Sequence, residues 1–404
     1  MKILHTSDWH LGKTLDGFSR QNEQGMFLEE LSHILEREEI DMMLISGDIF
    51  DNPIPPFKAE NMLYKYLKKY SKNGERPIII ISGNHDSPEK LEALNSLSMD
   101  YGIIFIGSIN TIIPEGNYGK WSIIKSSEGF IKIDKDGETI SIVTLPYIND
   151  KTILSQSEGE AKDVNLQKNY SKDIGELINK LTLSFSEDSI NIVMAHLFLQ
   201  NGEPSDSERE ILGGSLLVNM NDLPTSPQVY ALGHLHKTQN FIHEKSKMSY
   251  SGAPIKYSKS ERRNKNSVNI IDMKRGMVPE IKREYLNDYK PIEIWTAYST
   301  EEAIEICTKN KDKDCYVYFE IYCENFLERD LVSTLKKIKK DIVEIKPCLN
   351  ASEMTWDETE DLNFKTMEEI FFDFYKFKKG KVPSSEIMNV FNEIIEDGGY
   401  NETN

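Results

Sequence analysis

The feature of the sequence that most restricts its fold is a series of short apolar runs, each ending in polar residues. The runs KILHTS, DMMLISGD, PIIIISG and IIFIG lie in residues 1 to 110, and the groups SDWH, GDIFD and GNHD follow the first three. Two later runs, SINIVMAH and QVYALGHLH, end in histidine. Strands that are apolar on both faces are typical of sheets covered by helices, so the pattern predicts a layered α/β fold.

The spacing of these runs also predicts how the chain is divided. Helix-like segments over about 21–39, 57–72 and 88–98 alternate with the early strands, and a hairpin turn is expected at Asp136-Gly137. We assign this first domain to residues 1–275. A second α/β pattern predicts a small domain over 285–348, in which no polar cluster indicates chemistry.

Residues 349–404 are predicted to form an acidic linker and two amphipathic helices. The segment from Ala351 to Asn404 holds 13 acidic and 5 basic residues, which makes it a poor DNA-binding element. Two apolar stripes recur at helical spacing: Met367, Ile370, Phe371, Phe374 and Phe377, and then Ile387, Met388, Val390, Phe391, Ile394 and Ile395. Such helices pack on their own protein by default, and they can also bind the helices of a partner.

The polar groups at the strand ends form one candidate site. Its members are Asp8, His10, Asp48, Asp51, Asn84, His85, Asp86, His196, His234 and His236. In open α/β sheets, ligand sites gather at the carboxyl ends of strands. Asp8 and His10, like His234 and His236, are two residues apart, so in extended backbone both members of each pair would point to the same side.

These residue types indicate a metal site. Carboxylate, imidazole and amide ligands without a thiolate suit Mn²⁺, Fe or Zn better than Mg²⁺, and the ligands are too many for one ion. Two ions that share a bridging carboxylate activate a water molecule and bind both oxygens of a phosphoester displacement. A single D-x-H or G-H-x-H can equally be structural, but five such groups in order, each after an apolar strand, favour the functional interpretation.

The motifs in this order resemble the calcineurin-like metallophosphoesterases. The stretches MKILHTSDWHLGK, ISGDIFDNPIPP, ISGNHDSPEKL, AHLF, ALGHLHK and SGAPIKYS are similar to the SbcD-like nuclease subunits of bacterial DNA double-strand-break repair. The resemblance implies a four-layer α/β/β/α sandwich with a small α/β capping domain and a C-terminal two-helix tail. It covers residues 1–275 with specific motifs and the rest more loosely.

The resemblance also implies a role for each site residue. One ion would be held by Asp8, His10, Asp48 and His236, and the other by Asp48, Asn84, His196 and His234. His85 would be the catalytic histidine that is not a ligand, and Asp86 or a backbone group would orient its ring. Asp51 stands where archaeal and eukaryotic relatives carry a second active-site histidine, so its role here is open, with support of a ligand or of the loop as the alternatives.

The charge of the chain bears on its partners. A formal net charge of −18 is unusual for a protein that grips DNA unaided, because phosphate neutralisation supplies most non-specific affinity. The basic segment 256–265 offers candidate phosphate contacts at Lys256, Lys259, Arg262 and Arg263, with a solvated loop as the alternative. In the SbcD-like family the C-terminal helices bind the coiled-coil ATPase SbcC, which implies a homodimer of this chain within a heterotetramer.

The resulting prediction is a Mn²⁺-dependent DNA nuclease, a double-strand 3′–5′ exonuclease and single-strand and hairpin endonuclease that works with an SbcC-like ATPase in repair, recombination and replication. A phosphodiesterase for small nucleotides is the alternative, and a scaffold without activity is disfavoured because every expected ligand is present. No membrane span or signal peptide is visible, so we expect a cytoplasmic, nucleoid-associated protein.

Overall fold

The computed structural model describes residues 1–148, 166–208, 216–323 and 327–349, together with single residues between 371 and 391. The chain forms two compact units, one of residues 1–321 and 327–346 and the other of residues 322–326 and 347–404. The candidate site lies entirely within the first unit.

A six-stranded sheet carries the first half of the motifs. Its order is β18-β17-β1-β4-β5-β6. The strands are β1 (Lys2–Thr6), β4 (Met42–Ser46), β5 (Ile78–Ile81), β6 (Ile103–Ile106), β17 (Ser267–Asp272) and β18 (Glu280–Tyr285). The four strands β1, β4, β5 and β6 run parallel, and β17 and β18 add an antiparallel part at the other edge, which continues past residue 275.

An eight-stranded mixed sheet carries the later motifs. Its order is β15-β16-β14-β11-β10-β9-β8-β7. The strands are β7 (Gly116–Asn117), β8 (Trp121–Ser127), β9 (Phe130–Lys135), β10 (Glu138–Leu145), β11 (Ile190–His196), β14 (Val229–Gly233), β15 (Gln239–His243) and β16 (Ser246–Tyr250). The predicted turn joins β9 to β10, and Asp136 and Gly137 both have positive φ, of 54° and 80°.

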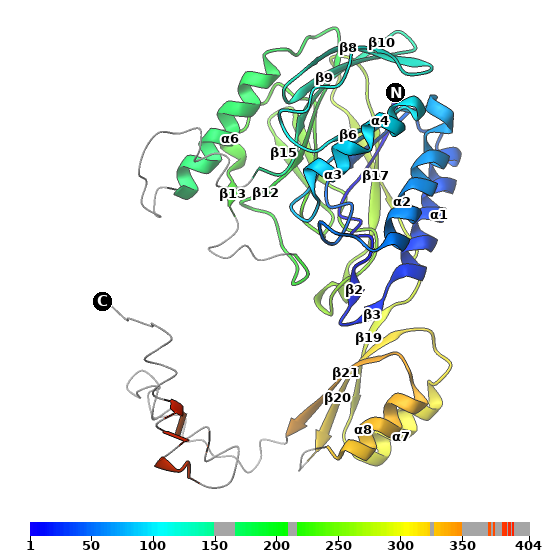
Figure 1. The fold of residues 1–404 in the computed structure, drawn as a ribbon, viewed down its shortest axis with the longest axis vertical. Helices are drawn as coiled ribbons and strands as arrows, with labels where there is room; N and C mark the ends of the chain where they lie inside the picture. The colour runs from blue at the N-terminus through cyan, green and yellow to red at the C-terminus, as the bar shows by residue number, and fades with distance from the viewer. Residues whose placement is uncertain are drawn as a thin grey trace. The chain divides into compact units, whose positions relative to one another are not determined.

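Helices cover the outer faces of the two sheets (Figure 1). They are α1 (Gln21–Arg37), α2 (Phe57–Tyr70), α3 (Pro88–Ala93), α4 (Asn95–Ser98) and α6 (Leu166–Thr182). One core joins α1 and α2 to the first sheet, a second lies between the sheets, and a third joins α6 to the second sheet. The layer order is therefore helix, sheet, sheet, helix.

Short elements fill the connections. These are β2 (Thr14–Leu15), β3 (Phe18–Ser19), β12 (Phe198–Leu199) and β13 (Leu217–Val218), with the 3₁₀ turns η1 (Lys72–Gly74), η2 (Met99–Tyr101), η4 (Met220–Asp222) and η5 (Ser260–Arg263).

The small α/β pattern forms a three-stranded sheet in the order β19-β20-β21. Its elements are β19 (Ile292–Ala297), α7 (Thr300–Lys309), β20 (Tyr316–Cys323), α8 (Arg329–Ile338) and β21 (Ile342–Leu349). Ser299 caps α7 by accepting the backbone N–H of Glu302 at 3.1 Å. Tyr316 joins this sheet to the larger body by donating its hydroxyl to Glu23 at 2.9 Å. The predicted boundary between the first domain, which ends at residue 275, and the small domain, which begins at residue 285, stays a prediction.

Most of the expected tail lies outside the described residues, including Met367, Ile370, Phe374, Phe377, Ile394 and Ile395. Among those described, the rings of Phe371 and Phe391 stack with centroids 3.8 Å apart. The helices in the described ranges all lack the length or the apolar character needed to cross a membrane.

Candidate metal centre

The candidate residues meet where parallel strands of both sheets end. β1, β4 and β5 of the first sheet and β14 of the second lead into the loops that carry most of them, and His196 is the last residue of β11. Two hydrogen bonds tie the sheets together at this edge. Nδ1 of His196 donates to the carbonyl oxygen of Ser46 at 2.9 Å, and the backbone N–H of His234 donates to Oδ1 of Asp8 at 3.0 Å. The site is thus built across the junction of the two sheets.

Left-handed backbone, rather than strand alternation, directs several of these side chains. β1 ends at Thr6 and β14 ends at Gly233, before the polar pairs begin. Asp8, His10, Asp48 and His234 have φ of 55°, 44°, 52° and 106°. The expectation of extended D-x-H and H-x-H pairs was therefore wrong. Non-glycine residues with positive φ are uncommon, and their concentration here is typical of functional sites.

The first group of converging ligand atoms comes from Asp8, His10 and His236, whose donor atoms all lie within 4.8 Å of one another. Nε2 of His10 lies 2.9 Å from Nε2 of His236 and 3.5 Å from Oδ2 of Asp48. All four side chains are buried.

The second group shares Asp8 and Asp48 and adds His196, Asn84 and His234. Oδ1 of Asn84 lies 3.0 Å from Nε2 of His196 and 3.0 Å from Nδ1 of His234. Nε2 of His196 is also 3.6 Å from Oδ2 of Asp48. Asp48 therefore lies between the two groups, as a bridging ligand must.

Two observations show that this arrangement fits cations. Nδ1 of His196 carries the proton that it donates in the hydrogen bond to the carbonyl oxygen of Ser46. In the neutral ring Nε2 therefore has no proton, and its lone pair faces the lone pairs of Asn84 Oδ1. In addition, Asp8 and Asp48 are buried, and neither forms an ion pair with a lysine or arginine of the described residues. Bound cations would satisfy both the facing lone pairs and the buried carboxylates.

The electrostatics point the same way. Burial raises the pKa of Asp8 well above its usual value, an effect that His236 reduces and Asp48 reinforces. Burial lowers the pKa of His10 well below its usual value and that of His234 to about 3. These two rings are therefore neutral, which is the form of histidine that binds a metal ion.

His85 lies outside these two groups, but with His10 and Asp51 it forms a third cluster of possible ligand atoms within 4.8 Å of one another. Its Nδ1 donates to the backbone oxygen of Asp51 at 2.6 Å, and its ring packs against the edge of His10 with centroids 4.7 Å apart. The Asp51 side chain forms an ion pair of 3.0 Å with Lys13. Of the two options for orienting His85, the structure shows the backbone group.

Asp86 instead fixes the loops. Its carboxylate accepts the backbone N–H groups of Ile49 at 3.1 Å, Phe50 at 3.0 Å and Gly83 at 2.9 Å. Burial, followed by the charge of Asp48, raises the pKa of Asp86 to about 7. Asp86 thereby holds the loop after β4 against the loop after β5.

Glu208 and Glu261 are site residues that the sequence motifs do not reveal. Glu261 accepts Nδ1–H of His236 at 2.9 Å, and Glu208 accepts the backbone N–H of the same histidine at 2.6 Å. Although burial alone lowers it, the hydrogen bond and charge of Glu261 raise the pKa of His236 to about 9. For Glu261, its position as the one acidic residue inside the basic segment 256–265 was the only sequence feature that could have indicated a role.

The candidate phosphate contacts occupy different environments. Lys256 is buried and pairs with Asp288, while Lys259 pairs with Glu320 at 3.2 Å. Arg262 is half-buried and donates to the carbonyl oxygen of Lys259 at 3.3 Å. Arg263 is exposed. Of the four candidates it is therefore the one whose side chain is open to solvent.

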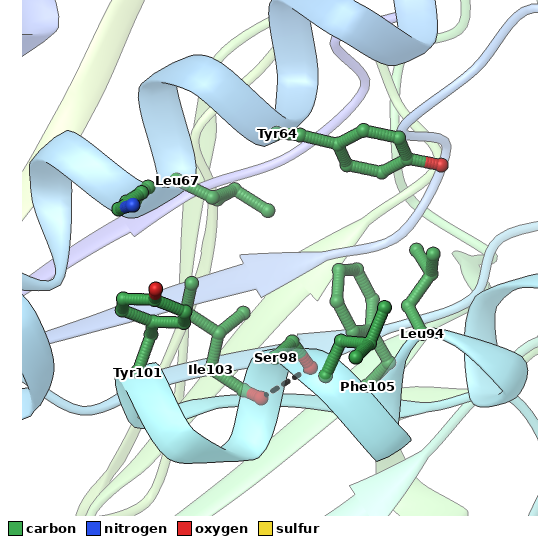
Figure 2. Close-up of a pocket in the computed structure, with 9 residues that line it drawn as sticks. Tyr64, Leu67, Leu94, Ser98, Tyr101, Ile103 and Phe105 are labelled. Carbon is green, nitrogen blue, oxygen red and sulfur yellow. Dashed lines mark hydrogen bonds between the residues drawn. The ribbon is translucent and has the colours of Figure 1, made fainter.

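A separate apolar hollow of about 290 Å³ lies between α2, α4 and β6 (Figure 2). Tyr64 and Leu67 of α2 face Tyr101, Ile103 and Phe105 across it. Leu97 at its rim is 76% exposed, and nearby on the chain Phe57 at the start of α2 is 78% exposed. Exposed apolar surface of this kind is typical of protein–protein contacts.

Comparison with known proteins agrees with the geometry. Residues 1–238 match the calcineurin-like phosphoesterase family. The SbcD component of the nuclease SbcCD from Bacillus subtilis (strain 168) is 32% identical over 397 residues, 98% of this chain and 97% of the relative. The protein of the same name from Staphylococcus epidermidis is 26% identical over 99% of this chain and 100% of the relative. The protein of the same name from Rhodobacter capsulatus is 31% identical over 69% of this chain and 68% of the relative.

Proposed function

Since this chain belongs to the calcineurin-like phosphoesterases and, among them, to the SbcD nuclease subunits, we propose that it cleaves phosphodiester bonds of DNA with two divalent metal ions. The observation that carries the proposal is the convergence of six imidazole, carboxylate and amide side chains around Asp48. Nitrogen and oxygen donors without a thiolate favour Mn²⁺ as the ion.

The proposed ligand sets follow the two groups of side chains. Asp8, His10, Asp48 and His236 hold one ion, and Asp48, Asn84, His196 and His234 hold the other. Asp8 also lies within reach of the second group. When bound, the two ions would acidify a water molecule and neutralise charge on the reacting phosphate.

His85 has the geometry of a proton donor. Because Nδ1 donates to the backbone oxygen of Asp51, Nε2 is the ring atom left to interact with the substrate. We assign to it protonation of the leaving oxygen or stabilisation of charge on the phosphate. Lys13, paired with Asp51 at 3.0 Å, adds positive charge beside it.

DNA is the proposed substrate, and a second protein would hold it. A net charge of −18 argues against tight DNA binding by this chain alone. The relatives are named as one component of the nuclease SbcCD, so a further component is part of that enzyme. An SbcC-like coiled-coil ATPase bound by residues 349–404 would supply the DNA affinity that this chain lacks.

The chain is also proposed to form a homodimer. The hollow between α2 and α4, with Leu97 at its rim, supports this assignment, because two copies would cover each other's exposed apolar side chains. A heterotetramer with two ATPase subunits follows.

The test is Mn²⁺-dependent release of end label from double- and single-stranded DNA, with a chromogenic phosphodiester as the small substrate. Cleavage of DNA by the wild type that is lost in His85→Gln supports the proposal. Cleavage of the small ester alone, even with the ATPase subunit added, would instead identify a small-nucleotide phosphodiesterase. The polarity of label release tests the 3′–5′ assignment, and a hairpin substrate tests the endonuclease.

A further inference from the structure

Glu261 is an acidic residue in an unexpected setting for its sequence. It lies in η5 within the basic segment 256–265, yet it is only 1% exposed. Burial of an ionised glutamate is unfavourable unless several donors surround it. Its contacts therefore reveal what it is for.

Four donors converge on this carboxylate. Oε1 accepts from Nδ1 of His236 at 2.9 Å, from the hydroxyl of Ser205 at 2.9 Å, and from the hydroxyl of Ser207. Oε2 accepts the backbone N–H of Tyr257 at 2.5 Å. With its hydrogen bonds directed into the protein, Glu261 neither meets a phosphate nor reaches solvent.

The consequence for His236 is a fixed ring and a fixed tautomer. The Nδ1–H group lies 2.9 Å from Oε1 of Glu261 and 2.6 Å from the hydroxyl oxygen of Ser207, which itself donates to Glu261. Nε2, which lies 2.9 Å from Nε2 of His10, is therefore the ring nitrogen that gives up its proton when His236 binds an ion. A second acid holds the backbone, since Glu208 accepts the N–H of His236 at 2.6 Å. The Tyr257 ring packs against the imidazole with centroids 6.3 Å apart.

We propose that Glu261 is a positioning residue for the metal centre, acting through His236 by holding Nδ1–H and thereby aiming Nε2 at the ion. This rests on the proposed two-ion site, which it extends by one residue. The same arrangement of carboxylate, histidine and metal ion recurs in other proteins, where its loss lowers metal affinity by about 10- to 100-fold.

A double-mutant cycle separates this role from a structural one. Mn²⁺ binding is measured by calorimetry for the wild type, Glu261→Ala, His236→Ala and the double variant. We expect Glu261→Ala to weaken one of the two sites by at least about 10-fold in the wild-type background. With His236 already absent, the same change should have little effect. Equal losses in both backgrounds, or no loss in the wild-type background, would overturn the proposal.

A matched control exists at Glu23, which is 4% exposed, pairs with Arg20 at 3.2 Å and accepts the Tyr316 hydroxyl at 2.9 Å, because neither of these partners is a proposed ligand. Glu23→Ala should leave Mn²⁺ affinity unchanged. If Glu261→Ala does not fold, Glu261→Gln replaces it in the cycle, because it keeps the size and one acceptor while losing the charge.

The imidazole ¹⁵N spectrum of the metal-free protein decides the matter independently of metal binding. Measured above pH 9, where the His236 ring is neutral, the wild type should carry the ring proton on Nδ1, and Glu261→Ala should shift this signal toward the value averaged over both tautomers. An unchanged signal would contradict the positioning role. If the wild type itself fails to bind Mn²⁺, the proposed two-ion site is wrong, while this spectrum still shows whether Glu261 orients His236.

Discussion

The backbone N–H of His85 donates a hydrogen bond of 2.9 Å to Oδ1 of Asp48. The residue proposed to handle the proton is thus fixed in space by the residue proposed to bridge the ions. Their side chains nevertheless have separate tasks, because the carboxylate of Asp48 lies among the ligand atoms of both groups and the ring of His85 lies in neither.

This separation predicts opposite metal contents for two variants. Asp48→Ala should lose both Mn²⁺ ions, because the bridging carboxylate is shared. His85→Gln should keep both and lose activity, because its ring lies outside the two ligand sets. Elemental analysis of the two purified proteins checks this, and equal metal content in wild type and Asp48→Ala would overturn the ligand assignment.

Removal of the Asp86 carboxylate should destabilise the fold without removing a ligand. Asp86→Ala leaves three buried N–H groups, those of Ile49, Phe50 and Gly83, without their acceptor. Each unsatisfied group costs about 1–3 kcal/mol, so we expect a loss of at least about 3 kcal/mol in unfolding free energy. Urea denaturation of the metal-free protein measures it. A loss below about 1 kcal/mol would show that the loops hold together without this carboxylate.

Gly83 should tolerate no side chain at all. A Cβ there would collide with the carboxylate and the backbone nitrogen of Asp48. Gly83→Ala should therefore destabilise the protein by about 1–3 kcal/mol and weaken metal binding. The matched control is Gly25→Ala in α1, where the new Cβ meets only Met62 at 3.9 Å and should stabilise the helix by about 0.5–1 kcal/mol. Equal melting temperatures for the two variants would contradict this contrast.

The apolar hollow beside α2 should govern self-association. Leu97→Glu places a charge at its rim and should convert a dimer to a monomer, because the carboxylate would have to be buried in the contact. Leu183→Glu is the control, since Leu183 is 80% exposed and does not line the hollow. Sedimentation velocity distinguishes the two. A Leu97→Glu protein that remains dimeric would place the interface elsewhere.

Among the basic residues of segment 256–265, Arg263 should contribute most to DNA binding. Arg263→Ala should weaken binding evenly across sequences and reduce the slope of log affinity against log salt by about one, as expected for one phosphate contact. The control is Arg275→Ala, because Arg275 pairs with Glu138 at 3.0 Å on another part of the surface. An unchanged slope for Arg263→Ala would return the segment to the solvated-loop interpretation.

The order of the motifs was enough to predict much of the site. Because parallel strands end at a common edge of a sheet, the apolar runs before Asp8, Asp48 and Asn84 were enough to predict that these three residues lie close together. The helices over 21–39 and 57–72 agree with α1 and α2 to within two residues at each end. Local patterns therefore sufficed wherever a side chain acts directly after its own strand.

Long-range partners could not be predicted in this way. Glu261 reaches His236 across 25 residues of chain, and nothing in SKSERRNK distinguishes it from a solvated acid. Lys256 similarly pairs with Asp288, so a residue expected at the surface is buried. Asp86 was one of the two alternatives for orienting His85, but its local loop brings it to three backbone groups instead, and a backbone oxygen orients the ring. These contacts depend on tertiary packing that composition and periodicity do not encode.

The four left-handed residues Asp8, His10, Asp48 and His234 carry a further consequence for the stability of this protein. Their backbone geometry suits glycine better than any side chain, so replacement by glycine would relieve strain at the same time as it destroys the site. The strain at these four positions is therefore a stability cost that the surrounding sandwich has to offset for the site to exist.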